Sequence, residues 1–229
     1  MIRIKKLEEP QILKENSKKW TNEYLDYIRR GVEIPDSVKK RYSNPEIRNQ
    51  LIKETHRKCA YCESKFCSVE YGDIEHIKPK FPDAHPELYV TWSNLTMSCE
   101  ICNRSGKRTY NNDKEPLLNP YTDEINNEIM GLGPFISWKT KKGMISIDTL
   151  LLNRTALIEK RTEAIKKIDL LLKQYHLETN ESYKEILLNC IKEAVSDENE
   201  YSFVLREYLL DFCEKTDNQV LRTFLADLY

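Results

Sequence analysis

The chain has 229 residues, of which 40% are apolar, and its 36 basic and 37 acidic residues give a net charge of −1. This length supports one large domain or two small ones with a buried core, and the low content of 6 glycines and 9 prolines excludes collagen-like and linker-dominated chains. Because no segment approaches the roughly 18 consecutive apolar residues of a membrane helix, and the charged start lacks the apolar stretch of a secretory signal, we expect a cytoplasmic protein that does not bind a membrane.

Residues 1–58 are predicted to form a basic helical region. They contain 15 basic and 9 acidic residues. A basic segment favours contact with a polyanion, although solvated helix faces would give the same count. Gly31 stands where a glycine commonly ends a helix. The Asn44-Pro45 pair is typical of a helix start, with asparagine as the N-cap and proline in the first turn.

Residues 59–120 are predicted to be irregular, with short strands at residues 72–77 and 94–98. The next segment, residues 121–154, is predicted to be a connector with a β-hairpin, whose strands lie at 135–140 and 144–147 around a turn at Lys142-Gly143. Residues 155–229 show apolar stripes at helical spacing, which predicts a C-terminal helical region. The predicted fold class is therefore α+β and mainly helical.

Four of the seven cysteines form two pairs that are typical of a metal site. The pairs, Cys59-Ala-Tyr-Cys62 and Cys99-Glu-Ile-Cys102, are separated by 36 residues, and four thiolates at this spacing best fit a tetrahedral Zn²⁺ ion. Disulfides are not expected in the cytoplasm, and a thioredoxin-like redox site needs a single pair in a βαβ setting. Because four sulfur ligands leave no open position, we expect this zinc to be structural.

Between the two pairs, Glu75 directly precedes His76 on the first predicted strand. A carboxylate next to a histidine suits a hydrolytic metal site, in which the carboxylate holds a hard cation and the histidine activates water as a general base. By itself this dipeptide is weak support, because such a pair is more often an exposed strand end. Residues near the second cysteine pair strengthen it, namely Asn94, Asn103, Arg104 and Lys107.

Taken together, the order Cys-x-x-Cys, Glu-His, Asn-Leu and Cys-x-x-Cys-Asn-x-x-x-Lys resembles the HNH endonucleases. The resemblance implies a central, zinc-stapled ββα-metal nuclease core at residues 59–120, between the helical N-terminal and C-terminal regions. Asn103 stands at the third motif position in place of histidine, a variant found in many active family members, and Glu75 stands where aspartate is commonest. The longer Glu75 side chain could shift the metal ion, although both residue types supply carboxylate oxygens.

The resemblance also implies roles for individual residues. His76 would be the general base, and Glu75 and Asn103 would bind the catalytic Mg²⁺ or Mn²⁺ ion. Asn94 would hold the loop backbone so that His76 keeps its orientation. Two cations would contact the substrate phosphate near the start of the last motif helix, namely Lys107 and Arg104.

Flanking segments extend the resemblance to one subfamily. Residues 59–63, 74–79, 92–95, 115–120 and 152–154 together resemble the PtuB-like nucleases of the Septu and retron anti-phage systems. The resemblance implies a nuclease that cuts nucleic acid, with DNA favoured, and that works with a PtuA-like ABC-type ATPase. In retron systems a reverse transcriptase and its nucleic acid would be further partners.

The C-terminal region carries no motif of the family and is assigned no catalytic residue. Its 10 basic and 15 acidic residues favour contact with a basic protein surface over contact with DNA. We therefore interpret residues 155–229 as a scaffold and partner-docking region. The alternative is that these helices only cover the exposed apolar side of the zinc-stapled core.

Two alternatives to a DNA-cutting nuclease stay open at this point. A zinc-stapled module that binds nucleic acid or protein without catalysis would contain the same cysteine pairs, with Glu75-His76 incidental. An RNA-cleaving HNH effector would contain the whole motif, because the motif acts on phosphate geometry and does not reveal the sugar. Loss of nucleic-acid cutting in His76→Ala would distinguish a nuclease from a non-catalytic module. Assaying cleavage of DNA against cleavage of RNA would distinguish a DNA-cutting from an RNA-cleaving nuclease.

Overall fold

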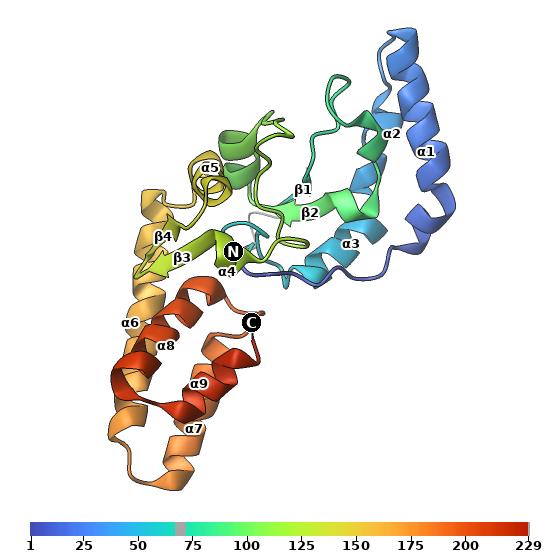
Figure 1. Cartoon of the computed structure of the whole chain (residues 1–229). Helices are drawn as coiled ribbons and strands as arrows, with labels where there is room; N and C mark the ends of the chain where they lie inside the picture. The colour runs from blue at the N-terminus through green and yellow to red at the C-terminus, as the bar shows by residue number, and fades with distance from the viewer. Residues whose placement is uncertain (67–71, 229) are drawn as a thin grey trace. The chain divides into compact units, whose positions relative to one another are not determined.

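The structure of the protein is a computed structural model that describes residues 1–66 and 72–228; residues 67–71, among them Cys67, and residue 229 lie outside the described residues. The chain divides into two compact units, one of residues Arg3–Asp123 and one of residues Met1–Ile2 with Glu124–Tyr229. In the described part of each unit, more residues lie in helices than in strands, and the strands form one antiparallel two-stranded sheet (Figure 1). The predicted α+β, mainly helical fold class is confirmed.

The unit Arg3–Asp123 contains the motif residues. Gly31 ends its first helix with a φ of 62°, and the Asn44 side chain caps the third helix by accepting a hydrogen bond from the Glu46 amide at 2.8 Å, as predicted. The elements are, in chain order, α1 (Gln11–Arg30), α2 (Asp36–Lys39), η1 (Arg41–Ser43), α3 (Pro45–Glu54), β1 (Asp73–His76), η2 (Pro86–Leu88), η3 (Trp92–Asn94), β2 (Leu95–Ser98) and the π-helix η4 (Ile101–Lys107).

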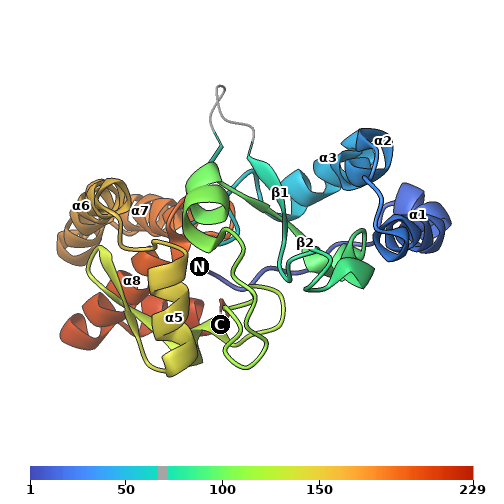
Figure 2. The same cartoon turned by 90° about the horizontal axis from the view of Figure 1, so that it is seen from above.

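Strands β1 and β2 pair antiparallel and place Glu75 opposite Thr96 and His76 opposite Leu95. The two strands lie within the predicted segments 72–77 and 94–98. Helices α1, α2 and α3 lie on the same side of this strand pair, as Figure 2 shows from above. Apolar side chains from the helices and from both strands form one core, among them Leu13, Ile47, Leu51, Ile74, Leu95 and Met97. The N-terminal helices therefore support the strand pair that carries Glu75 and His76.

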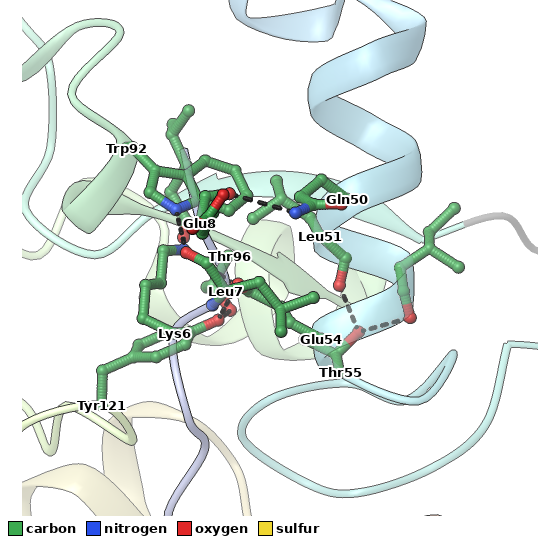
Figure 3. Close-up of polar contacts among 12 residues, drawn as sticks. Lys6, Leu7, Glu8, Gln50, Leu51, Glu54, Thr55, Trp92, Thr96 and Tyr121 are labelled. Carbon is green, nitrogen blue, oxygen red and sulfur yellow. Dashed lines mark hydrogen bonds and ion pairs between the residues drawn. The ribbon is translucent and has the colours of Figure 1, made fainter. Parts of the chain in front are cut away.

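A buried polar network ties the segment before α1 to α3 and β2 (Figure 3). The Lys6 ammonium lies 2.8 Å from the Glu54 carboxylate and 2.6 Å from the backbone oxygen of Leu95, and it packs over the Trp92 ring at 3.9 Å from the centroid. The Tyr121 hydroxyl donates to the same Glu54 carboxylate at 2.7 Å. Burial lowers the pKa of Lys6 to about 8, against the opposing effect of Glu54.

The second unit contains α4 (Ile125–Glu128), β3 (Ile129–Leu132), β4 (Phe135–Trp138), α5 (Lys141–Thr149), α6 (Thr155–Leu177), α7 (Glu181–Ala194), α8 (Ser202–Thr216) and α9 (Gln219–Ala226). The last four helices share an apolar core that includes Leu172, Ile191 and Leu209. Within residues 1–66 and 72–228, no helix combines the length and the apolar composition that crossing a membrane requires.

The predicted β-hairpin exists, and its first strand at 135–140 coincides with β4, but the predicted turn and second strand are wrong. The hairpin strands are β3 and β4, and the turn between them contains Gly133 with a φ of 57°, whereas Lys142 and Gly143 lie inside helix α5. A Cβ atom on Gly143 would clash with the backbone oxygen of Glu128, so this glycine serves the close approach of two backbones. The Thr140 side chain accepts a hydrogen bond from the Gly143 amide at 3.1 Å and so caps the helix that replaces the predicted turn.

Candidate active site

The four paired cysteines come together in one cluster. Cys59 and Cys62 lie in the turn after α3, and Cys99 and Cys102 lie where β2 leads into η4. All four are buried, and their sulfur atoms lie within 4.8 Å of one another. The sulfurs of Cys62 and Cys99 are 3.8 Å apart, and two ligands with bonds of about 2.3 Å to a tetrahedral zinc ion have nearly this separation. The cluster can therefore hold a zinc ion that joins the two segments.

His76 is the last residue of β1 and is buried, 5% exposed. Its Nε2 atom lies 2.8 Å from the backbone oxygen of Tyr89. A carbonyl oxygen only accepts, so Nε2 carries the proton, and the lone pair of the neutral ring is on Nδ1. Burial, together with the nearby ammonium of Lys80, holds the pKa of His76 well below its usual value. At neutral pH the ring is therefore neutral, and Nδ1, which accepts a long hydrogen bond of 3.4 Å from the Lys80 ammonium, is the position that can take up a proton.

Glu75, the residue before His76, forms a buried ion pair with Lys107 on η4. The two side chains are 7% and 3% exposed. The Lys107 ammonium also donates a hydrogen bond to the backbone oxygen of His76. The Lys107 ammonium thus neutralises the carboxylate that the resemblance assigns to the metal ion. The predicted contact of Lys107 with phosphate stays a prediction.

Asp73, at the start of β1, accepts hydrogen bonds from two polar residues of η4. The Arg104 guanidinium donates to both carboxylate oxygens of Asp73, at 2.9 Å and 2.8 Å. The Asn103 side-chain amide donates to the same carboxylate at 3.3 Å. The Arg104 side chain is 63% exposed, so this pair lies at the surface, and its predicted contact with phosphate also stays a prediction.

Asn94 holds the segment that follows His76. Its side-chain oxygen accepts a hydrogen bond from the Lys78 amide at 2.8 Å, and its side-chain nitrogen donates to the Lys78 backbone oxygen at 2.9 Å. The backbone oxygen of Asn94 also accepts from the Ile77 amide at 2.9 Å. These three bonds fix the chain directly after His76, which is the geometry that the predicted role of Asn94 needs.

The residues of the motif meet at one cavity. Glu75, His76, Asn103 and Lys107 all line a cavity of about 140 Å³. Its donor set fits a hard divalent cation, because Glu75 offers a carboxylate and Asn103 an amide oxygen, and Mg²⁺ or Mn²⁺ prefers such ligands together with water. The position of Lys107 agrees with this fit, because an ammonium group already lies against Glu75 and the His76 backbone oxygen.

Comparison with known proteins gives the family. The model of the HNH endonuclease family matches residues 59–108, which include the four cysteines and every motif residue described above. The chain is 31% identical to the Septu protein PtuB of Bacillus thuringiensis over 189 residues, which are 79% of this chain and 68% of that protein. The chain belongs to the PtuB-like HNH endonucleases.

Two further relatives agree with this membership. The Septu protein PtuB of Bacillus mycoides (strain KBAB4) is 34% identical over an alignment of 160 residues, and the match covers 56% of this chain and 54% of that protein. A protein of Vibrio cholerae serotype O1 biovar El Tor, named for an HNH endonuclease of retron Vc95, is 29% identical over 172 residues, or 70% of this chain and 79% of that protein. The predicted resemblance to PtuB-like HNH nucleases, and with it the prediction of an endonuclease, is confirmed.

Among the residues that line the cavity of this PtuB-like nuclease and had no role assigned from the sequence are Tyr42 and Lys80. The Tyr42 ring makes an edge contact with the His76 ring, at 4.7 Å between centroids. Lys80 lies four residues after His76 in the segment that Asn94 holds, and this closeness is a signal that could have identified it. Tyr42 lies in η1, far from the motif in sequence, and no pattern around it points to the site.

Proposed function

We propose that this protein is a metal-dependent HNH endonuclease that hydrolyses phosphodiester bonds in DNA, as the nuclease of an anti-phage defence system that includes a PtuA-like ATPase. The observation that carries the proposal is the orientation of His76. Its Nε2 proton is held by the Tyr89 backbone oxygen, and its Nδ1 lone pair accepts only a long hydrogen bond of 3.4 Å from Lys80, while the residue lines one cavity with Glu75 and Asn103. This is the arrangement that a general base needs next to a cation site.

In the proposed reaction, His76 removes a proton from the water that attacks the phosphorus atom. The hydrogen bond to Tyr89 keeps the ring in the required tautomer and stabilises the imidazolium that forms. Asn94 keeps the following chain in place, so the ring does not move away when it becomes charged.

Glu75 and Asn103 would hold the divalent ion. A bound Mg²⁺ or Mn²⁺ ion supplies positive charge that stabilises the charge developing on the phosphate and on the leaving oxygen. Lys107 would then lose Glu75 as its counter-charge, and its ammonium would become available to phosphate, as the family pattern implies. The zinc ion held by the four cysteines would have no part in the chemistry, because its coordination is closed.

Nicking of supercoiled plasmid DNA tests the proposal. The wild-type protein is expected to nick in the presence of Mg²⁺ or Mn²⁺ and to be inactive in EDTA, and His76→Ala is expected to lose activity while still binding DNA. His85→Ala is the matched control, because His85 is a histidine of the same unit that pairs with Asp113 at 3.2 Å. Nicking that survives His76→Ala contradicts the proposal, and a protein that cuts RNA but leaves DNA intact contradicts the choice of substrate.

The proposed ATPase partner would dock on the C-terminal helices. Residues 155–229 carry an excess of acidic over basic residues, and large apolar side chains are exposed on α6 and α7, with Leu177 at 78% and Ile186 at 57%. Exposed apolar side chains in a region of net negative charge are typical of a surface for a basic protein partner.

Co-purification tests this docking. Leu177→Glu combined with Ile186→Glu is expected to abolish co-purification with the ATPase and to leave plasmid nicking intact. Val32→Glu, which changes an exposed apolar residue of the other unit, is the control and is expected to leave co-purification unchanged. Normal co-purification of the double variant contradicts docking on this surface.

A further inference from the structure

Lys80 places its ammonium group beside the proposed general base. Its Nζ atom is 3.4 Å from Nδ1 of His76 and 4.1 Å from the centroid of the Tyr42 ring. Lys80 lines the same cavity as Glu75 and Asn103, and its side chain is half-buried. The ammonium therefore faces the place where a water molecule would be activated.

Within residues 1–66 and 72–228, Lys80 makes no ion pair, unlike three other cations around the site. Lys107 is paired with Glu75, Arg104 with Asp73, and Lys78 with Asp113 at 3.3 Å. Arg108, which is exposed, also lines the cavity and donates from Nε to the Ser105 backbone oxygen at 3.0 Å.

Keeping this ammonium in the cavity has a cost. Burial lowers the pKa of Lys80 to about 8, with Glu75 acting in the opposite direction. The group therefore remains mostly charged at neutral pH, in a place where a charge loses part of its hydration. The Tyr42 ring compensates for only a part of this loss. An anion that enters the cavity would find a cation whose charge is not yet matched by an ion pair.

The distance to His76 indicates which atom of the substrate Lys80 would meet. A water that gives its proton to Nδ1 lies about 3 Å from that nitrogen, and the phosphorus it attacks lies about 3 to 3.5 Å beyond. Lys80 Nζ donates to the same nitrogen at 3.4 Å, so when a water takes its place at Nδ1 the ammonium remains near enough to reach the oxygens beside the line of attack. The oxygens to the side of that line are the non-bridging oxygens of the phosphate.

We infer that Lys80 is a catalytic residue of this nuclease and that its ammonium contacts a non-bridging oxygen of the scissile phosphate. In the reaction the water oxygen forms the new bond to phosphorus, the water proton goes to Nδ1 of His76, and the leaving oxygen departs with the electron pair of the broken bond. Lys80 keeps its protons and stabilises the negative charge that grows on the non-bridging oxygen. The inference deepens the proposed function and rests on it.

Single-turnover nicking of supercoiled plasmid at saturating Mg²⁺ tests the inference. Lys80→Gln is expected to reduce the rate constant by about 100- to 1,000-fold, the usual effect of removing one donor to the developing charge. Lys80→Arg keeps the charge and is expected to stay within about 10-fold of wild type, a difference of about 1.4 kcal/mol in the barrier. Lys78→Gln is the matched control on the same segment and is expected to change little. Thermal unfolding of each variant shows whether the fold is intact, and Lys80→Met replaces Lys80→Gln if the latter does not fold.

The outcomes separate this inference from the proposed function. If the wild type nicks and Lys80→Gln nicks equally fast, or if Lys80→Arg loses as much activity as Lys80→Gln, the inference is wrong and the proposed function stands. If the wild type cuts neither DNA nor RNA, the proposed function fails. Binding of inorganic phosphate, followed by calorimetry, then tests the contact alone: weaker binding by Lys80→Gln supports it, and equal binding or no binding by the wild type overturns it.

Discussion

Lys107 and Glu75 form a buried ion pair. This pair predicts that the metal ion competes with Lys107 for Glu75, the only anionic ligand that the motif offers the ion. Lys107→Met removes the ammonium and keeps an apolar side chain of similar length. Because the ion no longer has to displace the ammonium from Glu75, we expect the variant to bind Mn²⁺ more tightly than the wild type does in the absence of nucleic acid.

The size of the effect follows from the contacts that the ion must break. Lys107 and Glu75 are 3% and 7% exposed, so little water screens their interaction, and Lys107 also donates to the His76 backbone oxygen. A hydrogen bond to a charged group contributes about 1.5 to 3 kcal/mol net. Since about 1.4 kcal/mol corresponds to a factor of ten in affinity, the dissociation constant for Mn²⁺ should fall by about 10- to 150-fold.

Calorimetric titration of Mn²⁺ into zinc-loaded protein measures this constant directly. Lys78→Met is the control, because it removes a cation of the same unit whose pair with Asp113 is exposed. Glu75→Gln is expected to lose Mn²⁺ binding, because it removes the anionic ligand. An affinity of Lys107→Met that equals the wild-type value, or falls below it, would refute the competition.

Three other expectations concern the zinc ion, the general base and the N-terminal network. Metal analysis should find one zinc ion per chain, and Cys99→Ser should lose the ion and unfold at lower temperature, because binding energy there is folding energy; a zinc-free protein of unchanged stability contradicts this. The nicking rate should fall as pH decreases through a midpoint below about 6.5, because the neutral ring of His76 is the active form and burial lowers its pKa; a midpoint above the usual histidine value contradicts the sign. Lys6→Met should cost about 3 to 5 kcal/mol in urea unfolding, because it leaves Glu54 buried without its counter-charge. Adding Glu54→Leu to Lys6→Met should restore part of the loss, and additive losses would show that the two residues do not act as a pair.

The elements that position the site could be predicted because their signals are local. The spacing within each cysteine pair is short enough for one turn to present both sulfurs, and the structure brings the two pairs together. Asn44 and Gly31 act at the helix ends where they were expected, since capping depends on only a few neighbouring residues. The hairpin was misplaced because Gly143 satisfies a tertiary contact with Glu128 and not a local turn. The sequence alone does not reveal whether a glycine is required for a local turn or for a close tertiary contact.

The pairing of charges in the site could not be predicted, for a different physical reason. Lys107, Arg104 and Lys80 are all cations near one motif, and the sequence pattern assigned phosphate to the first two. Which cation has a carboxylate partner depends on how η4 packs against β1 in the folded protein. In this packing Lys107 pairs with Glu75 and Arg104 pairs with Asp73. Lys80 follows Pro79 on the segment that Asn94 holds directly after His76, and within the described parts of the chain it has no ion-pair partner. The ammonium that the motif does not name is therefore the one for which we infer a contact with phosphate.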